Sequence, residues 1–145
     1  MTVLVNLLVY RQMQAKEIYV SNSEWKNLYN EFQKTPDGIY FYTYDDAEYP
    51  FYIGICRAKS YNIAGRIWAE LDDYKEGQYW FVKDLEKLRD LSCFKKGMAK
   101  PELDGLFYHP GEKPPEKNFE EFLDKVWITF TQVNQVKSEV SLELI

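Results

Sequence analysis

The sequence has 145 residues and a mass of 17.3 kDa, which fits a single domain able to bury a hydrophobic core. Hydrophobic residues make up 46% of it and charged residues 28%, a balance that excludes an intrinsically disordered chain. The net charge of −5 argues against tight binding to nucleic acid by bulk charge, and two cysteines with one histidine are too few for a four-cysteine or multi-histidine zinc site.

The first 37 residues predict a hairpin followed by a helix. Residues 3–10 are rich in Val and Leu, and residues 17–20 are a second β-prone stretch. The apolar run is too short to span a membrane and lacks the flanks of a secretory signal, so we expect a soluble, cytoplasmic protein. Ser21 and Glu24 then form a capping box. The helix that follows has apolar residues at helical spacing: Trp25, Leu28, Tyr29 and Phe32.

The middle of the chain predicts two strands and a helix. Aromatic and β-branched residues fill 38–44 and 51–55, and the short polar link between them indicates an antiparallel hairpin. A helix then begins near residues 60–62 and ends at Gly77. Its apolar stripe has members three or four residues apart: Ile63, Ile67, Leu71 and Tyr74. An adjacent stripe carries Asn62, Arg66, Glu70 and Asp73.

The rest of the chain combines short elements with a long loop. Leu85, Leu88 and Leu91 predict a helix over 80–92, and the many Gly and Pro residues of 95–118 predict a loop. We expect a short helix over 117–124, a strand over 126–133 and a final helix that begins at Ser138. The sequence ends seven residues after Ser138 and two after Glu143, so we expect that either the chain is a piece of a longer protein or this glutamate is poorly fixed.

Two tripeptides stand in the predicted hairpin: Gly38-Ile39-Tyr40 and, eleven residues later, Tyr52-Ile53-Gly54. They could be ordinary strand segments of a tyrosine-rich chain. However, six specified residues at this spacing resemble the defining motif of the GIY-YIG endonuclease superfamily. The resemblance covers 38–74 well and 126–145 loosely, and it does not extend to 1–37 or 75–125. It implies one α/β (α+β) domain with a small, three-stranded, mostly antiparallel sheet flanked by helices, in which 1–37 is an N-terminal extension and 75–125 an insertion.

The tyrosines and glycines of the two tripeptides have roles in this family. The resemblance implies that Tyr40 is the general base that activates a water molecule, and that Tyr52 orients the nucleophile or the phosphate. A tyrosine can act as a base if a nearby cation lowers its pKa. Gly38 and Gly54 would let the backbone approach closely where a side chain would clash. Without the motif, both tyrosines would be half-buried strand aromatics.

An arginine and a glutamate complete the catalytic set that the resemblance implies. Asn62-Ile63-Ala64-Gly65-Arg66 matches the family's Asn-Leu-x-x-Arg pattern, and a guanidinium can hold two phosphate oxygens at once. Leu142-Glu143-Leu144-Ile145 resembles the family's metal-binding segment, so Glu143 would hold Mg²⁺ or another divalent cation such as Mn²⁺, with Glu139 as the alternative. The structural alternatives are a pair of Arg66 with Glu70 and a solvated Glu143.

Several further residues are auxiliary candidates. Glu70 departs from the family pattern, in which histidine or tyrosine is common at this position, and its carboxylate could bind a metal, accept a proton or neutralise Arg66. Arg57 or Lys59 would replace a lysine that some relatives carry after the second tripeptide, and Asn62 belongs to the arginine pattern. Lys95 and Lys96 are weaker candidates for phosphate contact, because acidic residues interleave with the basic ones around them.

These features predict a metal-dependent endonuclease that hydrolyses phosphodiester bonds in DNA. Tyr40 would act as the base, Arg66 would stabilise the phosphate and Glu143 would hold the metal ion. The alternative is a binding or interaction module that keeps the GIY-YIG fold and has weak or no cleavage, which the sequence pI of about 5.0 and Glu70 favour. We expect a bacterial, phage or mobile-element origin.

Overall fold

The computed structural model describes residues 7–20, 22–33, 37–57, 62–78, 81–89, 107–108 and 111–133. The elements in chain order are β1 (Leu7–Gln14), α1 (Ala15–Tyr19), α2 (Ser23–Phe32), β2 (Gly38–Tyr44), β3 (Tyr52–Cys56), α3 (Ile63–Glu76), β4 (Phe81–Val82), the 3₁₀ helix η2 (Leu85–Arg89), β5 (Phe107–Tyr108), α5 (Glu116–Lys125) and β6 (Val126–Val133). They form a four-stranded antiparallel sheet in the order β1-β6-β2-β3 and a small sheet of β4 and β5. The mixed α/β class is as predicted.

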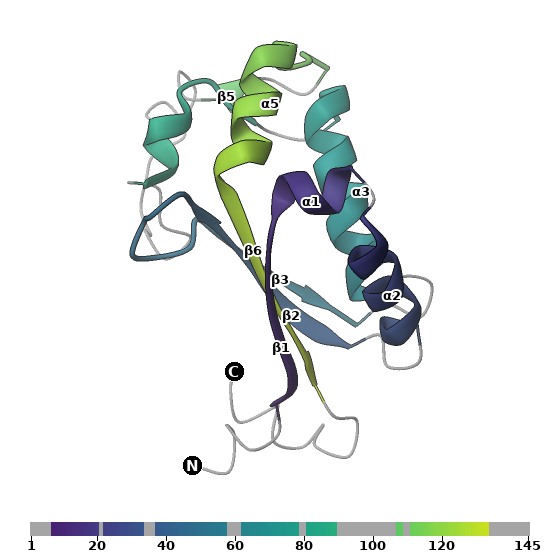
Figure 1. Ribbon diagram of the computed structural model, residues 1–145. Helices are drawn as coiled ribbons and strands as arrows, with labels where there is room; N and C mark the ends of the chain where they lie inside the picture. The colour runs from purple at the N-terminus through teal and green to yellow at the C-terminus, as the bar shows by residue number, and fades with distance from the viewer. Residues whose placement is uncertain are drawn as a thin grey trace.

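The main sheet has four strands rather than the three predicted, because β1 adds to it. Strand β6 lies between β1 and β2 and runs antiparallel to both (Figure 1). Strand β2 pairs with β6 on one side and β3 on the other, so Tyr40 lies opposite both Phe130 and Gly54. Alternate residues of β2 are buried, and these include Tyr40, Tyr42 and Tyr44, so one face of the sheet packs into the core.

The prediction of an N-terminal hairpin is wrong. Strand β1 pairs with β6 from Leu7 to Gln14, and the residues after it form helix α1 in place of a second strand. Ala15 and Ile18 are fully buried and three residues apart, a spacing that brings two side chains to one face of a helix but not of a strand. Burial of this face against the core overrides the β propensity of residues 17–20.

Helices α2 and α3 lie side by side next to the sheet, as Figure 1 shows. The cap of α2 is Asn22 rather than Ser21, since the Asn22 Oδ1 accepts a hydrogen bond from the Trp25 backbone N–H at 2.7 Å. Helix α3 is confirmed: it begins after Asn62 and ends at Gly77, which adopts the left-handed conformation. Its predicted apolar stripe is buried: Ile63, Ile67, Leu71 and Tyr74.

The segment predicted to be an insertion contributes to the same hydrophobic core. The predicted helix over 80–92 is instead a two-residue strand, β4, and the short η2, within the residues that the structure describes. The predicted helix over 117–124 is confirmed as α5, although the loop expected over 95–118 includes β5 and the first turn of α5. Phe81 packs against Phe122 and Tyr74, with ring centroids 5.0 and 5.8 Å apart.

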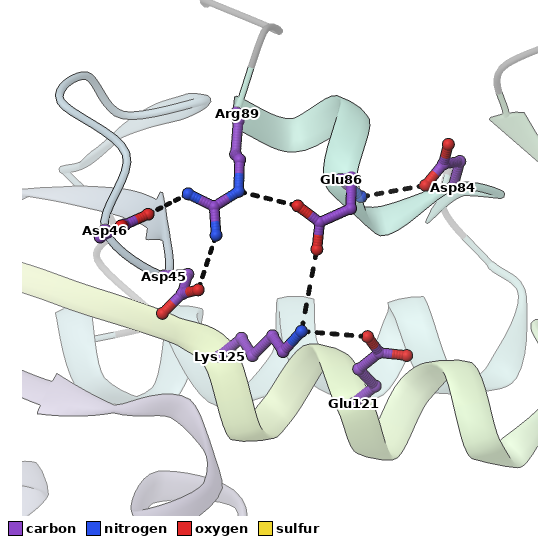
Figure 2. A network of polar contacts seen from close by, with 7 residues as sticks. All are labelled: Asp45, Asp46, Asp84, Glu86, Arg89, Glu121 and Lys125. Carbon is purple, nitrogen blue, oxygen red and sulfur yellow. Dashed lines mark hydrogen bonds and ion pairs between the residues drawn. The ribbon is translucent and has the colours of Figure 1, made fainter.

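An exposed group of ion pairs, which we call the Arg89 network, fastens η2 to two other elements (Figure 2). Arg89 pairs with Asp45 at 2.6 Å, with Asp46, and with Glu86 at 2.8 Å. Lys125 lies 3.7 Å from Glu86 and 3.2 Å from Glu121, which completes the network. It joins the turn after β2, the η2 helix and the end of α5. In the part of the chain that the structure describes, no helix is long and apolar enough to cross a membrane.

Candidate functional site

The carboxylate of Glu70 is the centre of a buried polar cluster between α3 and the sheet. Its Oε1 accepts a hydrogen bond from the Tyr40 hydroxyl at 2.5 Å and another from the Tyr52 hydroxyl at 3.2 Å. Its Oε2 accepts one from the Tyr42 hydroxyl at 2.5 Å. Only 9% of the Glu70 surface is exposed. Glu70, these three tyrosines and Arg66 make up what we call the Glu70 cluster.

The geometry of the hairpin brings the three hydroxyls together. Tyr40 and Tyr42 are two residues apart in β2, so they point to the same face of the sheet, and Tyr52 lies opposite Tyr42 in β3. The rings pack closely, with centroids 5.2 Å apart for Tyr42 and Tyr52 and 5.5 Å apart for Tyr40 and Tyr42. The three hydroxyls therefore reach one carboxylate, and each is a donor to it.

The two glycines of the motif have structural reasons for being glycine. Gly54 lies opposite Tyr40, and a Cβ at this position would collide with the Tyr40 ring. A Cβ at Gly38 would lie 2.6 Å from both the Ile63 side chain and the Thr131 carbonyl oxygen. The close approach expected of these glycines is therefore to the protein's own side chains and backbone. Gly54 in particular allows Tyr40 to lie across β3 toward Glu70.

Arg66 lies at the solvent-exposed edge of the cluster, one helical turn before Glu70. Its Nε is 3.5 Å from the Glu70 Oε1, and 48% of its side chain is exposed. The interaction of the guanidinium with the Tyr40 hydroxyl is the main reason that the pKa of Arg66 is raised above its ordinary value. Arg66 is thus held by two partners inside the protein and still presents a charged surface to solvent.

Burial and the neighbouring carboxylate keep the tyrosines protonated. The pKa of Tyr40 is raised well above its ordinary value, first by burial and then by its hydrogen bond to Glu70. The pKa of Tyr42 is raised in the same direction, first by burial and then by the charge of Glu70. Arg66 lowers the pKa of Tyr40, but less than burial and Glu70 raise it. Both hydroxyls therefore act as hydrogen-bond donors near neutral pH.

The structure brings some predicted site residues together and places others elsewhere. Tyr40, Tyr52 and Arg66 meet at Glu70. Asn62 has a structural role, because its Oδ1 caps α3 at 2.6 Å from the Gly65 backbone N and its Nδ2 donates to the Tyr29 carbonyl of α2 at 3.2 Å. Arg57 is exposed just beyond β3, at the opposite end of that strand from Tyr52. Five predicted residues lie outside the described residues: Lys59, Lys95, Lys96, Glu139 and Glu143.

Sequence reasoning missed Tyr42, although a signal for it was present. The alternation of a strand places residues i and i+2 on the same face, and this rule alone puts Tyr42 beside Tyr40. Its hydrogen bond to Glu70 is as short as that of Tyr40, and the residue is fully buried. The motif contains only one of the two tyrosines of β2 that bind Glu70.

The described residues do not make up the metal site that the resemblance implies. Among them, no three His, Cys, Asp or Glu side chains lie close enough together to hold a metal ion. Both oxygens of Glu70 accept hydrogen bonds from tyrosine hydroxyls, and one also faces the positive charge of Arg66. The carboxylate is therefore surrounded by donors and a cation where a metal ion would need a free lone pair. Glu143 as a ligand stays a prediction.

No protein-family model, curated protein or solved structure matches this chain. The function of the site therefore has to be inferred from its residues and their geometry. The most informative feature is a carboxylate that binds three tyrosine hydroxyls and an arginine. Two of those tyrosines belong to the two tripeptides, and the arginine ends the separate pattern that begins at Asn62.

Proposed function

We propose that this protein is a metal-dependent endonuclease that hydrolyses phosphodiester bonds, with DNA as the expected substrate. The observation that carries the proposal is the meeting of Tyr40, Tyr52 and Arg66 at the buried Glu70. These side chains come from β2, β3 and α3, so the sheet and helix hold them in a fixed arrangement. Phosphodiester hydrolysis needs a cation to stabilise the phosphate and a group to accept a proton from water, and the half-exposed Arg66 and Glu70 would supply these two functions.

Arg66 would bind the phosphate. Its charge persists at any physiological pH, and its planar guanidinium can donate to two phosphate oxygens while Glu70 and Tyr40 hold its inner edge. These two contacts fix the orientation of the guanidinium before the substrate arrives. The group would then be in place to stabilise the negative charge that develops as water attacks the phosphorus.

Tyr40 and Glu70 would together remove the proton from the attacking water. The raised pKa of Tyr40 makes its phenolate scarce at neutral pH, so the role of base passes to Glu70. The attacking water would reach the Tyr40 Oη from the Arg66 edge of the cluster, because the rest of Tyr40 is buried. As the water oxygen bonds to phosphorus, its proton moves to the Tyr40 Oη, and the Tyr40 proton moves to the Glu70 Oε1, from which it is lost to solvent before the next turnover. The ester bond to the leaving oxygen breaks, and that oxygen takes a proton from solvent. Tyr52 would keep Oε1 oriented toward Tyr40.

A divalent cation at Glu143 would supply further neutralisation of the phosphate charge. Because Glu143 lies outside the described residues, the roles of Arg66, Tyr40 and Glu70 are argued without it. The need for a metal is therefore a separate part of the proposal, with a test of its own.

The test is cleavage of a mixed panel of plasmid, single-stranded, duplex and branched DNA and of RNA, with Mg²⁺, with Mn²⁺ and with EDTA. We expect the wild type to cleave and the Tyr40→Phe, Arg66→Ala and Glu70→Gln variants to lose at least about 100-fold in rate. Tyr44→Phe is the matched control, because Tyr44 is a buried tyrosine of the same strand outside the Glu70 cluster. Arg11→Ala is the control for an exposed arginine.

The outcomes separate the parts of the proposal. Circular dichroism and urea unfolding identify any variant that fails because it does not fold. If folded Tyr40→Phe and Arg66→Ala cleave as fast as the wild type, these residue assignments are wrong. Cleavage that persists in EDTA contradicts the metal requirement alone.

The second candidate function is a binding module without cleavage, and a specific observation favours it. The Glu70 carboxylate already neutralises Arg66 and accepts three hydrogen bonds, as a purely structural cluster would. This candidate is supported if the wild type cleaves nothing in the panel yet binds one of its members. The affinity of that complex should then be unchanged in Tyr40→Phe.

A further inference from the structure

A groove between α2 and α3 has no role in the proposed chemistry. Its volume is about 370 Å³, it is open to solvent, and five side chains line it: Trp25, Lys26, Tyr29, Asn30 and Trp68. Three of the five are aromatic and two are polar, and Lys26 is the only charged residue among them. In a chain with a net charge of −5, a groove whose single charge is positive favours an anionic ligand.

The aromatic rings of the groove are held in place and accessible. Trp25 is 4% exposed and belongs to the core, whereas Tyr29 and Trp68 are 38% and 41% exposed. Trp68 stacks on Tyr19, with ring centroids 6.3 Å apart and an angle of 10° between the ring planes. The Lys75 ammonium lies 5.4 Å from the centroid of the Tyr19 ring and supports that stack. Exposed aromatic faces on a fixed support are suited to stacking with a flat ligand.

The groove borders the part of α3 that carries Arg66. A Cβ at Gly65 would lie 3.2 Å from the Tyr29 ring, so Tyr29 packs on the residue next to Arg66. The hydrogen bond from Asn62 to the Tyr29 carbonyl fixes α2 against the same turn of α3. The groove therefore lies next to the turn of α3 that carries Arg66.

We propose that this groove binds an unpaired nucleobase of a single-stranded nucleic acid, with Lys26 on a neighbouring phosphate. Every base has a flat aromatic face, so stacking on Trp68 and Tyr29 needs no particular sequence. The Asn30 amide offers a donor and an acceptor to the edge of the base. A duplex hides its base faces in the stack, so this groove favours single strands, loops and ends. This site would add a substrate contact to the proposed endonuclease. The inference that its ligand is a nucleic acid rests on that proposed function.

The experiment measures binding apart from cleavage. Fluorescence anisotropy with a labelled oligodeoxythymidylate of about 12 nucleotides, within the usual range of binding-site sizes, is done in EDTA. We expect Trp68→Ala to weaken binding about tenfold or more, because it removes a stacking surface, and Trp68→Phe to retain most of it. Trp127→Ala is the matched control, since Trp127 is 37% exposed but lies on β6 and does not line the groove.

A second variant tests the lysine. Replacing Lys26 by Gln should weaken binding and reduce the slope of log K against log salt by about 0.7, as expected for one lost phosphate contact with a single strand. An oligouridylate of the same length distinguishes RNA from DNA as the source of the base. A duplex of the same length should bind more weakly than either single strand.

Several results would overturn the site. The groove is not the binding site if Trp68→Ala and Trp127→Ala bind the oligonucleotide equally well, or if the duplex binds best. A proline-rich peptide that binds where oligonucleotides do not would identify the groove as a peptide site. These outcomes are independent of cleavage: a wild type that cleaves while Trp68→Ala binds normally contradicts only the groove. A wild type that never cleaves, with binding lost in Trp68→Ala, contradicts only the proposed catalysis.

Discussion

The Glu70 cluster and the Arg89 network use the same kinds of charged groups in opposite surroundings. In the Glu70 cluster one buried carboxylate accepts hydrogen bonds from three tyrosines and faces a single arginine. In the Arg89 network one arginine meets three carboxylates, and its partner Asp46 is 80% exposed (Figure 2). Bulk solvent competes for the partners in the network, whereas it does not replace Glu70 as the acceptor for Tyr40 and Tyr42, which are 1% and 0% exposed.

The two sets of polar contacts therefore have different energetic consequences for the folded protein. Exposed ion pairs contribute little to stability, since solvent competes with them and salt screens them. A buried carboxylate is costly unless all its partners are present, and well-packed apolar residues would often be at least as stable. A protein that keeps Glu70 with a full set of donors is therefore consistent with a functional need for that carboxylate.

The largest expected effect is that of Glu70→Leu on stability. The change leaves the buried hydroxyls of Tyr40 and Tyr42 without their acceptor, and at about 1–3 kcal/mol for each the variant should lose about 2–6 kcal/mol. Arg66 is 48% exposed and remains solvated, so it adds little to this loss. Urea unfolding of the wild type and the variant measures the difference.

The control for Glu70→Leu is the triple variant that also carries Tyr40→Phe and Tyr42→Phe. It has no buried hydroxyl left unpaired by the loss of Glu70, so most of the lost stability should return. A triple variant as stable as the wild type but inactive would show that the cluster is kept for function. A triple variant no better than Glu70→Leu would contradict this view, because the loss would then come from packing around the substituted side chain on α3 rather than from unpaired hydroxyls.

A smaller effect should distinguish two tyrosines of one strand. Tyr42 donates to the Glu70 carboxylate, whereas the buried Tyr44 hydroxyl has no hydrogen-bond partner among the described residues. Tyr42→Phe should cost about 1.5–3 kcal/mol, the usual range for a hydrogen bond to a charged group, while Tyr44→Phe should be nearly neutral or slightly stabilising. Urea midpoints of the two variants, measured side by side, test this. Equal losses would mean that both hydroxyls have partners of similar strength.

Local sequence signals predicted the elements around the site, and the reason is that these elements depend on near neighbours. The periodicity of Ile63, Ile67, Leu71 and Tyr74 located α3, and the aromatic and β-branched content of 38–44 located β2. The partner of β1 could not be predicted in this way, because the pairing of Leu7–Gln14 with β6 joins residues more than a hundred positions apart. No local pattern specifies such a pairing.

The site was predicted in part for the same reason. The two tripeptides pointed to Tyr40 and Tyr52, and helical spacing placed Arg66 and Glu70 one turn apart. The three hydroxyls meet at Glu70 because of the register of β2 against β3 and the packing of α3 on the sheet. The sequence pattern specifies neither of these. Glu70, which departs from the GIY-YIG pattern that the sequence resembles, lies at the centre of the cluster because of these tertiary contacts.

The smallest expected effect is that of Arg89→Met, which keeps most of the apolar stem and removes the charge. The variant should show a small drop in urea midpoint at low salt, and about 1 M NaCl should abolish the drop, because the Debye length is then only about 3 Å. Arg89 holds the pKa of Asp46 below its ordinary value of 3.8. The stability that this ion pair contributes is therefore present above pH 3.8 and is lost as the pH falls through the lowered pKa of Asp46.

The loss of stability in Glu70→Leu should persist in the same salt, since the groups that it leaves unpaired are buried. A drop in Arg89→Met that survives both high salt and low pH would mean that Arg89 acts through packing on the Tyr44 ring, 5.8 Å away, and the two regions would then differ less than their exposure indicates.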